Sequence, residues 1–128
     1  MFYNMLKDKL SLPAKTIGIL IFLINTCSYT YTALINPGIP LLENSSLAKV
    51  KGANILLCKE CKNWVRLSFN TSHCYECNVC VEGYDHHCPW ISKCIGRKNI
   101  VSFYIFVVST LCLFCYLVFT VSLLSNTM

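Results

Sequence analysis

Cysteine and histidine residues are concentrated in one polar segment of this 128-residue chain, between positions 58 and 94. Their order reads C-x2-C-x11-H-C-x2-C-x2-C-x5-H-H-C-x5-C. The two cysteines of a C-x2-C pair can direct both thiolates at one metal ion, because a tight turn brings them within reach of zinc–sulfur bonds of about 2.3 Å. The pattern therefore predicts zinc binding. The ten candidate donors are Cys58, Cys61, His73, Cys74, Cys77, Cys80, His86, His87, Cys88 and Cys94.

The number of donors favours two metal ions. Structural zinc is four-coordinate, so two ions would use eight of the ten donors and leave two free. Disulfide bonds are the alternative, because the seven cysteines would form three bridges in an oxidising compartment and leave one thiol. The odd number of cysteines and the interleaved histidines argue against disulfides. Metal binding would also supply the folding free energy that a short segment with few apolar residues lacks.

The adjacent residues Asp85, His86, His87 and Cys88 contain a candidate nucleophile. Adjacent side chains point in different directions, so one histidine can bind a metal ion while the other does not. A free histidine and a free cysteine beside Asp85 would form a nucleophilic group, in which the imidazole lowers the pKa of the thiol and the carboxylate orients the imidazole. The alternative is that these residues only cap and pack a zinc-binding turn. The spacing alone does not decide between the two, nor between the two histidines.

Two long uncharged apolar runs, residues 16–35 and 100–124, flank this segment and must position it. A helix of 20 residues at about 1.5 Å per residue spans roughly 30 Å, the thickness of the hydrocarbon core of a bilayer. The second run has 25 residues and can cross with some tilt. We therefore expect a membrane protein with two transmembrane α-helices that flank a small zinc-stabilised loop domain. Two buried helices of a soluble protein are the alternative, but the rest of the chain is too short to cover both.

The composition agrees with a membrane protein and excludes other classes. Hydrophobic residues make up 55% of the chain and charged residues only 13%, whereas average soluble domains contain about 25% charged residues. A net charge of +5 is too small for the dense basic face of a nucleic-acid-binding domain, so we expect no nucleic-acid partner. A cleaved signal sequence is the alternative for the first run, but that run is long for one and no convincing cleavage site follows it.

The two runs divide the chain into six segments. They are an N-terminal tail (1–15), a transmembrane helix (16–35), a linker (36–57), a cysteine-rich domain (58–99), a second transmembrane helix (100–124) and a C-terminal tail (125–128). The part between the helices holds 8 of the 11 lysines and arginines, so the positive-inside rule places it in the cytosol. Zinc-binding cysteines agree with that side, because the cytosol keeps thiols reduced.

The sequence DHHCPW at residues 85–90 resembles the DHHC family of protein S-acyltransferases, the membrane enzymes that palmitoylate cysteines. The resemblance extends upstream to SHC-x2-C-x2-C at residues 72–80 and downstream to CIG-x2-N-x3-F at residues 94–103. The NPG at residues 36–38 is similar to the family's Asp-Pro-Gly element after its second transmembrane helix. The resemblance covers about residues 16–124, which is nearly the whole chain.

The resemblance implies two interleaved zinc sites and a catalytic group. One ion would be bound by Cys58, Cys61, His73 and Cys80. The other ion would be bound by Cys74, Cys77, His87 and Cys94. In the family, the cysteine at Cys88 takes the acyl group from acyl-CoA as a thioester, the histidine at His86 acts as base, and the aspartate at Asp85 orients it. A thiol of a substrate protein then attacks the thioester, which is two-step ping-pong chemistry.

The resemblance also implies partners and a location. Palmitoyl-CoA or another acyl-CoA would be the co-substrate, cysteine-containing proteins close to the bilayer would be the acceptors, and the membrane would be an endomembrane such as that of the ER or Golgi. The family has four transmembrane helices, and the two found here correspond to its second and third. The spacing of eleven residues before His73 replaces the usual nine, and Lys93 replaces a usual asparagine. Two alternatives stay open: a catalytically inactive zinc-stabilised membrane module, and assembly into an oligomer.

Overall fold

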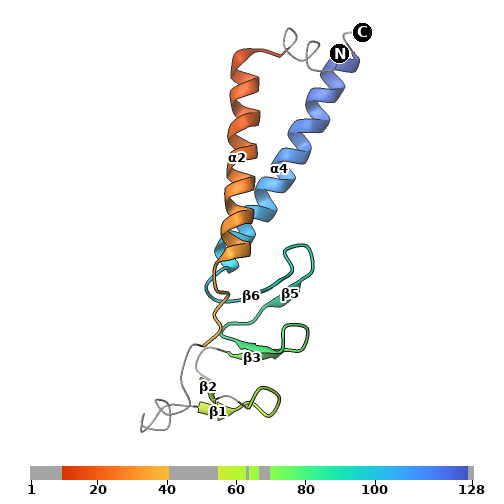
Figure 1. Ribbon diagram of the computed structural model, residues 1–128. Coiled ribbons are helices and arrows are strands. Elements are labelled where there is room, and N and C mark those ends of the chain that lie inside the picture. Colours follow the sequence, from red (N-terminus) through yellow and green to blue (C-terminus); the bar gives the residue numbers. More distant parts are fainter. Residues whose placement is uncertain (1–9, 41–54, 63, 67–69, 127–128) are drawn as a thin grey trace.

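The computed structural model describes residues 10–40, 55–62, 64–66 and 70–126. Two long helices lie side by side, and three short β-hairpins follow one another beyond one end of the helix pair (Figure 1). The chain enters the hairpins from the end of the first helix and leaves them into the start of the second. Most of the expected N-terminal tail, residues 41–54 of the expected linker and the last two residues lie outside the described part.

Both helices are long and apolar enough to cross a membrane. Helix α2 spans Leu12–Leu34 and helix α4 spans Ile100–Ser125, with mean hydropathies of 1.5 and 2.3. Helix α2 begins before residue 16, because Pro13 is tolerated in a first helical turn. Apolar side chains such as Ile19 and Phe114 point outward along both helices, whereas the core helix of a soluble protein would bury them. The fold class expected from the sequence is confirmed, with two candidate membrane-spanning helices around a cysteine-rich region.

Polar side chains join the two helices to each other. The Asn25 amide of α2 donates a hydrogen bond to the Thr110 hydroxyl of α4 at 2.7 Å. Further along the pair, the Tyr116 hydroxyl donates to the Ala14 carbonyl oxygen at 3.0 Å. The ring of Tyr116 lies so close to Gly18 that a Cβ atom there would be 2.6 Å from it. Hydrogen bonds and small residues of this kind hold helices together in lipid, where the hydrophobic effect does not drive helix association.

The region between the helices forms three antiparallel two-stranded sheets, each of which is one hairpin. Lys62, Asn78 and Ser92 each have a φ of 53° close to the start of the second strand of a hairpin, a left-handed conformation that ends the loop. The hairpins are β1–β2 (Ile55–Leu57 and Trp64–Arg66), β3–β4 (Ser72–Cys74 and Val79–Val81) and β5–β6 (His86–Cys88 and Lys93–Ile95).

A short turn after α2 holds the end of that helix against the start of α4. The Asn36 side chain accepts a hydrogen bond from the backbone N–H of Gly38 at 2.8 Å, which closes the turn. The Pro37 carbonyl oxygen accepts the backbone N–H of Lys98 at 3.2 Å. Gly96 lies against the same carbonyl so closely that a Cβ atom would be 2.8 Å from it, so a larger residue would force the backbone apart. The NPG element therefore joins the two helix ends on the side of the hairpins.

Asn99 connects strand β6 to helix α4. Its side chain is fully buried, its Oδ1 accepts the N–H of Gly96 at 2.8 Å, and its Nδ2 donates to the Cys94 carbonyl oxygen at 3.0 Å. Its backbone carbonyl accepts the N–H of Phe103 at 2.9 Å in the first turn of the helix. The end of the third hairpin is therefore tied to the first turn of α4.

We expect Asn99→Ala to lower the melting temperature of the protein by several degrees. The change removes both side-chain hydrogen bonds and leaves the Gly96 N–H and the Cys94 carbonyl buried without them, at a cost of about 1–3 kcal/mol per group. Thermal unfolding followed by circular dichroism in lipid nanodiscs measures the effect. Asn126→Ala at the exposed end of α4 is the control and should melt like the wild type. Equal melting temperatures for the two variants would contradict the role given to Asn99.

Candidate metal centres and active site

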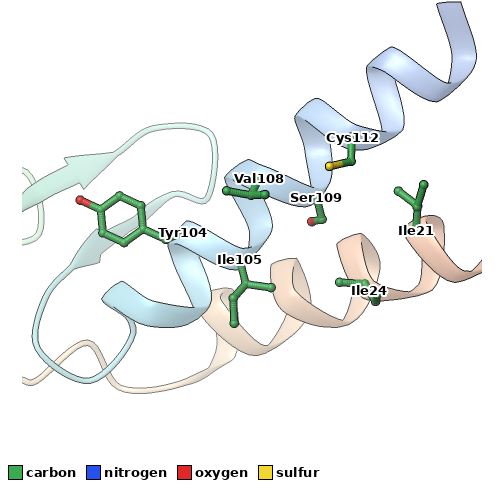
Figure 2. A pocket seen from close by; sticks show the side chains of 7 residues that line it. All are labelled: Ile21, Ile24, Tyr104, Ile105, Val108, Ser109 and Cys112. Carbon is green, nitrogen blue, oxygen red and sulfur yellow. The ribbon is translucent and has the colours of Figure 1, made fainter. Parts of the chain in front are cut away.

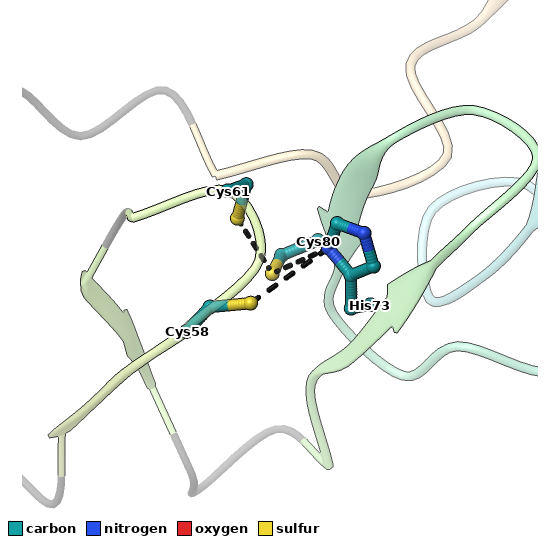
Figure 3. Close-up of side chains that lie close together, drawn as sticks. All are labelled: Cys58, Cys61, His73 and Cys80. Atoms are coloured by element: carbon teal, nitrogen blue, oxygen red, sulfur yellow. Dashed lines mark hydrogen bonds between the residues drawn. The ribbon is translucent and has the colours of Figure 1, made fainter.

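The first group of metal-ligand side chains joins the first hairpin to the second. Its ligand atoms all lie within 4.8 Å of one another, and their side chains converge on one point (Figure 3). The Sγ atoms of Cys61 and Cys80 are 3.2 Å apart, and the Cys58 Sγ lies 3.7 Å from the His73 Nδ1. Ligands around a tetrahedral zinc ion are separated by about 3.5 Å, given bonds of about 2.0–2.3 Å. The four side chains can therefore hold one tetrahedral ion.

The second group repeats this arrangement one hairpin further along. It consists of Cys74, Cys77, His87 and Cys94, again with ligand atoms within 4.8 Å of one another. The His87 Nδ1 lies 3.3 Å from the Cys77 Sγ and 3.8 Å from the Cys74 Sγ. The structure thus brings together the same eight donors, in the same two sets, that the sequence resemblance implies.

Strand pairing supplies two donors of each group, and a loop supplies the other two. His73 and Cys80 are partners across β3–β4, and His87 and Cys94 are partners across β5–β6. Partner residues in an antiparallel pair present their side chains on the same face, about 5 Å apart, so each pair of strands aims two ligands at one point. The C-x2-C pair in each group comes from the loop of the preceding hairpin. Each ion would therefore link two consecutive hairpins.

The buried thiols in these groups favour a cation. Desolvation raises the pKa of Cys80 and of Cys94 well above the ordinary value for a thiol, and hydrogen bonds with neighbouring thiols add to the effect. The backbone N–H of Cys61 acts in the opposite direction and lowers the pKa of Cys58. Buried thiols of this kind keep their protons unless a cation replaces them, so the chemistry of both groups fits a bound metal ion.

Asp85 and His86 form a pair outside both groups. The Asp85 Oδ2 lies 3.2 Å from the His86 Nδ1, and about two-fifths of each side chain is exposed. The edge of the His86 ring contacts Phe103 of α4, with the ring centres 5.2 Å apart. The carboxylate and the phenyl ring together hold the imidazole with its Nδ1 toward Asp85, which leaves the Nε2 for another partner.

Cys88 lies on the same strand as His86, two residues on, and is only 4% exposed. Because side chains alternate along a strand, His86 and Cys88 share one face of β5, and His87 points to the other face, toward the second metal group. Within the part of the chain that the structure describes, no hydrogen bond joins His86 to Cys88. The apolar residues around Cys88 are Ile91, Ile95, Ala33, Ile100, Phe103 and Phe106.

The helices contribute residues to this site that the sequence analysis did not identify. Ile100, Phe103 and Phe106 follow one another at intervals of three along α4 and turn one face of the helix toward Cys88. That spacing is a helical signal, but the sequence does not show which face of a transmembrane helix meets the hairpins. Lys93 was also missed in this role, and its Nζ donates a hydrogen bond to the Ala33 carbonyl oxygen at 2.7 Å. A cation is favourable there, because helix α2 ends at the next residue.

An apolar groove of about 410 Å³ between α2 and α4 is separate from this site (Figure 2). None of Asp85, His86 and Cys88 lines it. Its walls are formed by Ile21, Ile24, Tyr104, Ile105, Val108, Ser109 and Cys112. The groove lies along the helices and is part of the surface that would face lipid.

Known proteins resemble this chain over most of its length. Palmitoyltransferase pfa3 of Aspergillus fumigatus is 31% identical over 130 residues, which cover 88% of this chain and 23% of that protein. Palmitoyltransferase ZDHHC18 of Homo sapiens is 42% identical over 69 residues, which cover 54% of this chain and 16% of that protein. Palmitoyltransferase ZDHHC8 of Drosophila melanogaster is 42% identical over 72 residues, which cover 55% of this chain and 7% of that protein. The chain thus spans less than a quarter of the length of these relatives.

The sequence profile of the DHHC palmitoyltransferase family matches residues 52–128. This match includes all eight donors of the two metal groups, the Asp85–His86 pair and Cys88, and it ends beyond helix α4. It covers more than half of the chain, and the relatives that match the chain bear palmitoyltransferase names. The chain therefore belongs to the DHHC palmitoyltransferase family.

Proposed function

We propose that this chain catalyses protein S-palmitoylation, with Cys88 as the acyl carrier. One observation carries the proposal: of the ten cysteine and histidine donors between residues 58 and 94, the two metal groups use all but His86 and Cys88. These two lie on one face of one strand, and His86 contacts a carboxylate. A base oriented by a carboxylate next to a thiol is the arrangement that nucleophilic acyl transfer needs.

The proposed reaction has two steps in which the acyl group and the proton both pass through this site. His86 takes the thiol proton of Cys88 on its Nε2, while Asp85 stabilises the resulting imidazolium through the Nδ1. The thiolate attacks the thioester carbonyl of acyl-CoA, a new thioester forms at Cys88, and the CoA sulfur leaves with the proton from His86. In the second step a thiol of the substrate protein gives its proton to His86 and attacks the acyl group, which restores the free Cys88 thiol.

Both metal groups are proposed to hold structural zinc. Three thiolates and one imidazole around a tetrahedral centre are the donors that zinc prefers, and all four positions are filled by the protein. The ions would link the hairpins and leave no open position for a substrate. Their role is to hold β5, and with it His86 and Cys88, at the ends of the helices.

The site is proposed to face the cytosol at the surface of an endomembrane such as that of the ER or Golgi. Helix α4 begins five residues after strand β6 ends, so Cys88 would lie where the bilayer surface meets the hairpins. There the acyl chain can enter the hydrocarbon region while its thioester reaches Cys88, and each buried methylene contributes about 0.8 kcal/mol. The cytosol would supply acyl-CoA, and membrane-bound proteins with a cysteine near the surface would be the acceptors.

We expect Cys88→Ser to abolish autoacylation without loss of metal. Purified protein in nanodiscs is incubated with alkyne-tagged palmitoyl-CoA, and the hydroxylamine-sensitive label on the chain is measured. The serine variant should carry no such label and the same number of zinc ions as the wild type, because Cys88 belongs to neither metal group. Cys112→Ser, which removes an exposed thiol of α4, is the control and should be labelled normally. Label on the Cys88 variant, or on no form at all, would contradict the proposal and leave the non-catalytic module as the reading.

We expect two zinc ions per chain, bound more weakly as the pH falls. Binding must displace protons from the thiols of Cys80 and Cys94, whose pKa values are raised, so a higher proton concentration competes with the ion. Zinc release to a coloured chelator, measured between about pH 8 and about pH 6, should therefore rise toward the acidic end. Cys77→Ser should hold one ion fewer and Cys112→Ser should hold both. Release that does not depend on pH would exclude thiolate ligands.

We expect the hairpin region to remain unglycosylated in cells. Asn44 and Asn70 each begin an Asn-x-Ser/Thr acceptor sequence, and a luminal loop would expose them to glycosylation. The measurement is the gel mobility of the expressed protein before and after glycosidase treatment. An acceptor sequence added to a known luminal protein is the positive control. A mobility shift that disappears in Asn44→Gln would place the loop in the lumen and overturn the proposed orientation.

A further inference from the structure

The second and third hairpins have the same register and the same loop. In β3–β4, His73 pairs with Cys80, and the four residues that follow Cys74 lead to Val79. In β5–β6, His87 pairs with Cys94, and the four residues that follow Cys88 lead to Lys93. The last loop residue, Asn78 or Ser92, has a φ of 53° in both hairpins. Residues 72–81 therefore correspond one by one to residues 86–95.

This correspondence places Cys88 at the position of a metal ligand. The paired histidine and cysteine of the two hairpins match, and both pairs belong to metal groups. In the loops, Cys88 matches Cys74, which is the first cysteine of the C-x2-C pair in the second metal group. The second cysteine of that pair, Cys77, is matched by Ile91. The third hairpin therefore has the shape of a metal-binding loop with one of its two thiols replaced by an aliphatic side chain.

The surroundings of the third loop fit the same comparison. Each metal group takes two thiols from one hairpin loop and a histidine with a cysteine from the strands of the next hairpin. After the third hairpin the chain continues as helix α4. The side chains packed on Cys88 and Ile91 from the helices are apolar: Ala33, Ile100, Phe103 and Phe106. Where a following hairpin would supply two more ligands, the helices supply an apolar wall.

We infer that Ile91 is a positioning residue that keeps the sulfur of Cys88 free of metal and available for acyl transfer. The inference rests on the proposed function, because it gives a reason for the free thiol that the proposed reaction needs. Ile91 is 6% exposed and packs against Cys88, so a ligand at its position would lie beside the sulfur as Cys77 lies beside Cys74. A thiolate shared with a metal ion has its lone pairs engaged and is a poorer nucleophile than a free one.

The test converts the third loop into a complete C-x2-C pair. Four forms of the full chain are prepared in nanodiscs with Cd²⁺ in place of zinc: wild type, Ile91→Cys, Ile91→Ser and the double variant Ile91→Cys/Cys88→Ser. Serine is the matched control, because it differs from cysteine only in the atom that would bind the metal. Bound Cd²⁺ is counted by elemental analysis and by the thiolate-to-cadmium absorption band, and autoacylation is measured on the same samples with alkyne-tagged palmitoyl-CoA.

Ile91→Cys should bind one Cd²⁺ more than the wild type, and the double variant should lose this additional ion. Acylation of Ile91→Cys should fall at least tenfold as the additional ion binds, while the same Cd²⁺ concentration leaves the ratio of Ile91→Ser to wild-type acylation unchanged. Ile91→His, which offers an imidazole nitrogen on a side chain closer in size to isoleucine, should also bind an additional ion. That variant keeps the test decisive if the cysteine variant folds poorly.

Two results would overturn the inference. The first is the absence of an additional ion in both Ile91→Cys and Ile91→His, and the second is an equal loss of acylation in Ile91→Ser, which would make Ile91 a packing residue only. A failure of the proposed function looks different, because the wild type would then carry no hydroxylamine-sensitive label. The number of bound ions would still report in that case whether the third loop has the geometry of a metal-binding loop.

Discussion

The structure between the two helices depends on the convergence of four ligand atoms at each of two points. The strands are three residues long, and an isolated hairpin of that length is not stable in water. Val81 and Ile95 are fully buried, but few other apolar side chains are available to form a core. The cysteine and histidine groups hold consecutive hairpins together where packing cannot. The position of Cys88 therefore follows from that of His87, its neighbour on the strand.

One strand separates structural from chemical roles by simple alternation. On β5, His87 turns to the second metal group, while His86 and Cys88 lie on the opposite face toward the helices. The metal group therefore fixes the strand from one side, and Phe103 packs against both His86 and Cys88 from the other. Neither the hairpins nor the helices would form the site alone, because the hairpins carry the reactive groups and the helices supply their apolar surroundings.

The contact between hairpins and helices is made by a few buried polar groups. Asn99 ties strand β6 to α4, the turn at Asn36 and Pro37 joins the ends of both helices, and Lys93 donates to the last turn of α2. Each group is hydrogen-bonded to backbone, which sets a distance and a direction that apolar packing leaves free. This rigidity matters for a thiol at a bilayer surface, because its acyl donor has one end in lipid and the other in water.

The sequence by itself determined the two membrane helices, the donors and their approximate order along the chain. Helix length and hydropathy follow from local composition, and the C-x2-C spacing is a local property of a turn. It did not decide from spacing alone which of His86 and His87 joins a metal group, since that depends on which face of β5 meets the neighbouring hairpin. Nor did it identify Phe103, Ala33 and Ile91 as the surroundings of Cys88. Those contacts join residues up to tens of positions apart, and only the tertiary structure, in which the hairpins dock on the helix ends, decides them.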